Sequence, residues 1–66
     1  MEIIVNGEAR QVPETTGVPQ LLEMLDLAGR KLALEINCEI VPRSQYTTQR
    51  LQPGDRVEIV QAIGGG

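Results

Sequence analysis

The sequence predicts a single α+β domain in which a mixed sheet of about five strands is covered by one main helix. Three observations support this prediction. Short β-branched or alternating apolar segments recur along the chain, one segment repeats its apolar residues at helical spacing, and turn residues separate the segments. The 66 residues suffice for one domain. We expect a thin core, because so small a domain buries only about 60% of its unfolded surface.

The N-terminal segment is expected to form a β-hairpin. Three consecutive β-branched residues predict a strand over about residues 2–6. Asn6 and Gly7 follow, and both tolerate the positive φ of a tight hairpin turn. The second strand then runs to about Val12, because Pro13 cannot continue a hydrogen-bonded ladder.

One helix is predicted between the segment 15–19 and Gly29. A Thr or the Gly of that segment can cap the helix, and Pro19 suits the first turn, where a missing N–H does no harm. Gly29 is placed to end the helix in a left-handed conformation. The apolar residues at helical spacing are Val18, Leu21, Leu22, Leu25 and Ala28.

The second half of the chain predicts three more strands. Residues 32–36 form the third strand, and a tight turn leads into a short fourth strand that Pro42 stops. Residues 43–52 show no clean period. Apolar and polar residues alternate over 56–62, which predicts the last strand.

This order of elements predicts a β-grasp, or ubiquitin-like, fold. A helical crossover after the hairpin lets the first and last strands lie side by side and parallel. The helix must cover one face of the sheet, because neither element buries its apolar side alone. A ferredoxin-like fold would need a second helix, and residues 43–52 are too few and too polar to form one.

The composition provides few groups for catalysis. The chain has no His and a single Cys, Cys38, so it cannot form the usual zinc sites. We interpret Cys38 as a packed or turn residue, and the pair Arg30 and Lys31 as a solvated helix end.

The charge and the apolar runs exclude two further classes of partner. A formal net charge of -3 argues against a nucleic-acid-binding face, which needs clustered Lys and Arg. The apolar runs are too short for a membrane span, and no signal peptide is recognisable. We therefore expect a cytoplasmic protein with neither nucleic acid nor membrane as a partner.

The chain ends in three glycines, and we predict a folded domain over 1–63 followed by a flexible tail over 64–66. Without a Cβ, Gly64 and Gly65 can pass through a narrow channel and carry the carboxylate of Gly66 into a partner's site. The alternative is a tail without function, since chain termini often fray.

Strand alternation also predicts an exposed apolar patch beside the tail. Side chains alternate between the two faces of a sheet, so Val57 and Ile59 should face the core together with Ile3 and Val5. We expect Ile63 to be the last ordered residue, anchored to the domain just before the glycines. The outward-facing residues expected to form the docking patch are Ile4, Val60 and Ala62.

Several segments together carry a family resemblance that spans essentially the whole chain. They are residues 3–7 (IIVNG), 33–37 (ALEIN), 40–43 (IVPR), 54–58 (GDRVE) and 64–66 (GGG). At this length, the chain resembles the short β-grasp sulfur carriers, and in particular the ThiS-type sulfur carriers of thiamin biosynthesis.

The resemblance implies a cycle of sulfur transfer. A ThiF-type adenylyltransferase would use ATP and Mg²⁺ to adenylate the carboxylate of Gly66, and the carrier itself would bind no cofactor. A persulfide from a cysteine desulfurase or sulfurtransferase would then yield a thiocarboxylate. Thiazole synthase would take its sulfur for the thiazole ring. Gly65 and Gly66 match the functional tail, whereas Gly64 matches a position that also accepts other small residues. Arg43 and Tyr46 lie in a matching stretch without an assigned role.

Three other functions remain possible at this stage. The small subunit of molybdopterin synthase shares the fold and tail chemistry, but those chains tend to be longer and richer in aromatic residues near the end. A ubiquitin-like modifier would join Gly66 to a lysine. A β-grasp interaction module would carry an inert tail, and would bind its partner equally well without Gly65 and Gly66.

Overall fold

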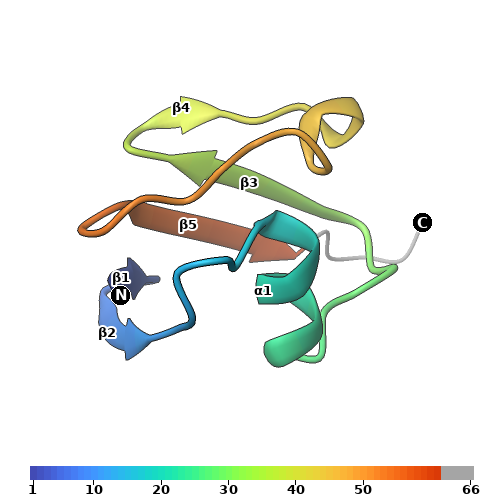
Figure 1. Ribbon diagram of the computed structural model, residues 1–66. Coiled ribbons are helices and arrows are strands. Elements are labelled where there is room, and N and C mark those ends of the chain that lie inside the picture. The colour runs from blue at the N-terminus through green and yellow to red at the C-terminus, as the bar shows by residue number, and fades with distance from the viewer. Residues whose placement is uncertain (62–66) are drawn as a thin grey trace.

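The computed structural model describes residues 1–61, which form a five-stranded sheet with one helix against it (Figure 1). The elements in chain order are β1 (Glu2–Val5), β2 (Glu8–Gln11), α1 (Val18–Met24), β3 (Leu32–Ile36), β4 (Glu39–Ile40), the 3₁₀ helix η1 (Arg43–Gln45) and β5 (Arg56–Gln61). These elements confirm the predicted α+β class of mixed sheet and single main helix.

The strands lie in the order β2-β1-β5-β3-β4. β1 and β5 are parallel neighbours in the middle of the sheet, and the other three pairs are antiparallel. The parallel pairing of the first and last strands is therefore confirmed. It places the last strand between two others, so β5 is held on both sides.

Two tight turns close the two hairpins, and each has two residues with positive φ. Asn6 and Gly7 have φ of 49° and 83°, and Asn37 and Cys38 have φ of 53° and 69°. Positive φ at both central residues matches the right-handed twist of the flanking strands. Cys38 is exposed in its turn, which confirms the turn interpretation over the packed one.

The helix begins where the sequence predicts but ends earlier. Gly17 is the N-cap, and its backbone N–H donates to the Oε1 of Gln20 at 3.0 Å. The expected end at Gly29 is wrong, because Asp26 already adopts the left-handed conformation with φ of 60°. The N–H groups of Asp26 and Leu27 donate to the carbonyls of Glu23 and Leu22, a Schellman arrangement.

The early end of α1 has two consequences. Arg30 and Lys31 lie beyond the helix rather than at its end, so the interpretation of this pair as a helix end is wrong. In addition, α1 is only seven residues long. Across residues 1–61, no helix is both long enough and apolar enough to cross a bilayer.

The core lies between α1 and one face of the sheet. Five residues are fully buried or nearly so: Ile3, Val18, Leu21, Leu34 and Val57. Val5 and Ile59 are also buried, so the predicted alternation along the first and last strands is confirmed. Among residues 1–61, α1 lies against one face of the sheet and no α-helix lies against the opposite face (Figure 1).

Candidate functional site

The predicted tail residues lie outside the described part of the chain. These are Gly64–Gly66, and the predicted docking residues Ala62 and Ile63 also lie outside the described part. The structure instead shows how the residues before them are held. Gln61, the last described residue, pairs with Leu32 at the start of β3. The tail therefore follows directly on a strand in the interior of the sheet.

β5 is paired along its whole length on one side and only at its start on the other. β3 pairs with it from Ile36 to Leu32, whereas β1 pairs only with Arg56 and Val57. Beyond β1, the side chain of Asn6 takes over: its Oδ1 accepts from the N–H of Ile59 at 2.7 Å, and its Nδ2 donates to the Ile59 carbonyl at 3.3 Å. One side-chain amide thus extends the ladder that precedes the tail.

The open face of the sheet carries two large exposed apolar side chains. Val60 is 64% exposed, as predicted, and it lies opposite Ala33. Ile40 is 73% exposed and lies opposite Glu35, which in turn lies opposite Glu58. Ile40 was missed by the sequence analysis. Because the buried Val41 follows it, alternation in the short fourth strand is the signal that could have found it.

Ile4 does not adjoin Val60, so the predicted continuous patch is not formed by these two residues. Ile4 is half-buried and lies opposite Arg56, and Val60 follows four positions later on β5. At about 3.3 Å per residue, that separation is about 13 Å along the strand. The parallel register is the reason, since it sets β1 beside the beginning of β5. We use the name docking face for Ile40 and Val60 together with the two neighbouring glutamates, Glu35 and Glu58.

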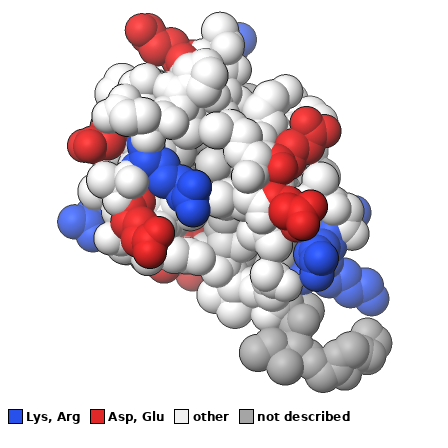
Figure 2. All heavy atoms as spheres, turned by 90° about the horizontal axis from the view of Figure 1, so that it is seen from below, with Lys and Arg blue, Asp and Glu red and all other residues white. Residues whose placement is uncertain are grey.

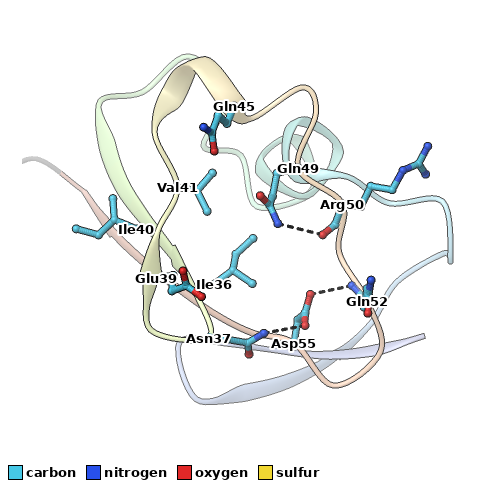
Figure 3. A pocket seen from close by; sticks show the side chains of 10 residues that line it. All are labelled: Ile36, Asn37, Glu39, Ile40, Val41, Gln45, Gln49, Arg50, Gln52 and Asp55. Carbon is cyan, nitrogen blue, oxygen red and sulfur yellow. Dashed lines mark hydrogen bonds between the residues drawn. The ribbon is translucent and has the colours of Figure 1, made fainter.

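A polar hollow of about 360 Å³ lies between the β3–β4 hairpin and the segment 45–55 (Figure 3). Asn37 Nδ2 donates to Asp55 Oδ1 at 3.0 Å, and the backbone N–H of Gln52 donates to Asp55 Oδ2 at 2.8 Å. These hydrogen bonds fasten the hairpin to the turn before β5, so we interpret them as structural. Neither Ile4 nor Val60, the predicted site residues within the described part of the chain, lines this hollow.

Acidic and basic side chains are interspersed over the face shown in Figure 2. Within residues 1–61, no group of three or more His, Cys, Asp or Glu side chains lies close enough to hold a metal ion.

Comparison with known proteins identifies the family. The model of the ThiS family matches residues 3–66 of this chain. The chain belongs to the ThiS family. It is 41% identical to the sulfur carrier protein ThiS of Escherichia coli over 66 residues, which cover 100% of both chains. It is 44% identical over 66 residues to a thiazole synthase of Paramagnetospirillum magneticum, but spans only 20% of that protein.

The solved structures agree with this assignment. The crystal structure of the thiamine biosynthesis protein ThiS from Geobacter metallireducens matches this chain with a TM-score of 0.85 at 32% identity, covering 100% of both chains. The β-grasp prediction is thereby confirmed, and so is the resemblance to the ThiS type.

Proposed function

We propose that this ThiS-family chain is a sulfur carrier of thiamin biosynthesis, and that its working group is the carboxylate of Gly66. The observation that carries the proposal is the end-to-end alignment with the E. coli sulfur carrier protein ThiS, which leaves no part of either chain unmatched. The Gly64–Gly66 end is included in the family match.

The chemistry follows from the weakness of a carboxylate as an acyl donor. An oxygen of the Gly66 carboxylate attacks the α-phosphorus of ATP, forming an acyl adenylate and releasing pyrophosphate. A persulfide then displaces AMP, and cleavage of the resulting acyl disulfide by a thiol leaves the thiocarboxylate. Transfer of this kind depends mainly on positioning and electrostatics, which a ThiF-type adenylyltransferase supplies with Mg²⁺.

The role of this chain is to deliver the tail. Ordering the tail in a partner's site costs about 1–2 kcal/mol per residue, and glycine lies at the expensive end of that range. Contacts made by the folded body must offset this cost. Val60 and Ile40 on the docking face are exposed apolar groups suited to that purpose, and we propose that Ala62 and Ile63 extend the contact toward the tail.

We propose thiazole synthase as the sulfur acceptor and a cysteine desulfurase or sulfurtransferase as the source. The acceptor is supported by thiazole synthases from two bacteria, Paramagnetospirillum magneticum and Magnetococcus marinus, in each of which about a fifth of the sequence matches this chain. We propose a cytoplasmic location for the carrier, because its adenylation needs cellular ATP.

Intact mass spectrometry of the protein recovered from its own cells tests the proposal. We expect a fraction of the molecules to carry one sulfur in place of one oxygen, and fragmentation to place that sulfur on Gly66. A chain lacking Gly65 and Gly66 is the control and should remain unmodified. A protein that stays fully carboxylate after incubation with ATP, the adenylyltransferase and a sulfur donor would refute the proposal.

A further inference from the structure

A second hollow lies between the end of α1, the segment that follows it and the region of η1. It has a volume of about 290 Å³ and a mostly apolar lining that includes Leu22 and Ala28. Its polar lining residues include Arg30, Arg43 and Tyr46, with Glu23 on α1. We call this hollow the basic groove. It brings together Arg43 and Tyr46, to which the sequence assigned no role.

The basic groove lies beside the point from which the tail departs. Arg30 stands two positions before Leu32, and Leu32 pairs with Gln61, the last described residue of β5. At most about 18 Å of extended chain separates Gln61 from Gly66, so a protein that takes the Gly66 carboxylate into its own active site approaches this end of the sheet. The groove is therefore within reach of the same partner.

The charges of the groove differ in sign from those of the chain as a whole. The chain has a net charge of -3, whereas two arginines against one glutamate give the groove a charge of +1. Among the side-chain hydrogen bonds of residues 1–61, none uses the guanidinium groups of Arg30 and Arg43 or the hydroxyl of Tyr46. A guanidinium group is a planar fork of donors that matches a carboxylate.

We propose that the basic groove binds an acidic segment of thiazole synthase. One apolar side chain of that segment enters the hollow, and a neighbouring carboxylate meets Arg30 or Arg43. The apolar lining favours such a segment over a bare anion, because a small anion would leave the apolar surface uncovered. This inference rests on the proposed sulfur-carrier function, since it names a contact with the partner that receives the tail.

Calorimetric titration with the thiazole synthase of the same organism tests the inference. The variant is the double charge reversal Arg30→Glu with Arg43→Glu. The matched control is Arg50→Glu with Arg56→Glu, which changes the net charge equally at two exposed arginines outside the groove, and Arg56 lies at the opposite end of β5 from Gln61. We expect the reversal to weaken binding at least tenfold and the control less than twofold, and we expect added salt to narrow the difference.

The same pair of substitutions in a chain lacking Gly65 and Gly66 separates the contribution of the groove to binding from the contribution of the tail. If the groove contacts the synthase directly, the reversal weakens binding by the same factor with and without the tail, because independent contacts add. If the reversal has no effect on the shortened chain, the groove acts through the chain's own terminus, and the inference is overturned.

Two further outcomes keep the inference apart from the proposed function. In the first, the wild-type chain acquires the thiocarboxylate and binds the synthase, and the charge reversal and its control bind with equal affinity. This outcome overturns the proposed groove contact but leaves the proposed sulfur-carrier function intact. A wild-type chain that neither acquires sulfur nor binds the synthase overturns both. Thermal melts check that each variant folds. If the charge-reversed variant does not fold, the milder double substitution Arg30→Gln with Arg43→Gln replaces it.

Discussion

At the scale of single residues, Asn6 has two functions that depend on different parts of the molecule. Its φ of 49° closes the first hairpin, a property that sequence predicts because Asn tolerates this conformation. Its side-chain amide also exchanges two hydrogen bonds with the backbone of Ile59, which lies 53 positions away. The second function follows only from the parallel pairing of β1 with β5.

This double role predicts an unequal response at the two hairpins. Asn6→Gly keeps the turn but leaves the part-buried N–H and carbonyl of Ile59 without partners, and we expect a loss of about 1–3 kcal/mol. Asn37→Gly is the matched control, because its two side-chain hydrogen bonds are exposed and water can replace them. Urea unfolding measures both losses. Equal losses would show that the Asn6 hydrogen bonds to Ile59 stabilise the fold no more than the exposed hydrogen bonds of Asn37.

At the scale of elements, α1 is too short to be stable by itself, and packing holds it in place. Isolated helices of fewer than about 12–15 residues are marginal in water. Val18, Leu21 and Leu22 are buried against the sheet, while Leu25 and Leu27 continue the contact after the helix has ended. The apolar pattern that predicted a helix to residue 28 is therefore shared between α1 and the turn that follows it.

The end of α1 predicts a stabilising substitution. Asp26 has φ of 60° and places a negative charge at the helix C-terminus, and both features are unfavourable for Asp. We expect Asp26→Gly to raise the free energy of unfolding by about 1 kcal/mol. Asp26→Asn removes the charge alone and should recover only part of this gain. Urea unfolding compares them, and a destabilised Asp26→Gly protein would mean that the carboxylate makes a contact of its own.

At the scale of the whole molecule, the fold covers one face of the sheet and leaves the other open. The single helix buries one set of alternating side chains, so the opposite set faces solvent whatever its composition. On that open face, Glu35 lies directly opposite Glu58, with Ile40 opposite Glu35 on its other side and Val60 two positions after Glu58 on β5. Like charges directly opposite one another are unfavourable in a sheet. The Glu35–Glu58 pair therefore does not stabilise the isolated domain. Such a pair is consistent with a surface whose role is to contact a partner.

The open face predicts a loss of binding without a loss of folding. Val60→Glu should lower the free energy of unfolding by less than about 1 kcal/mol, because Val60 is exposed and the added charge acts only through its neighbours. Binding to thiazole synthase should weaken several-fold or more in calorimetry. Gln11→Glu on the edge strand β2 adds the same charge at an exposed position and serves as the control. Unchanged affinity for Val60→Glu would remove the docking face from the proposed interface.

Local patterns predicted most of the fold because they act over a few residues. Turn pairs, alternation and the start of the helix each depend on neighbouring residues, so the hairpins, the core residues of the first and last strands and the order of the elements along the chain are confirmed. The glycine end and the dispersed segments also led to the ThiS family. The predicted helix end was wrong, because Asp26 already takes the left-handed conformation three residues before Gly29, which also has a positive φ in the turn that follows.

The sequence by itself determined which residues face the core and which face solvent, since that depends only on the period of each element. The tertiary structure alone decided which outward-facing residues are neighbours. The register of β1 against β5 separates Ile4 from Val60, and the pairing of β3 with β4 brings Ile40 onto the docking face. The folding of α1 against the η1 region gathers Arg30, Arg43 and Tyr46. Register and packing depend on contacts across the whole chain, and no local pattern encodes them.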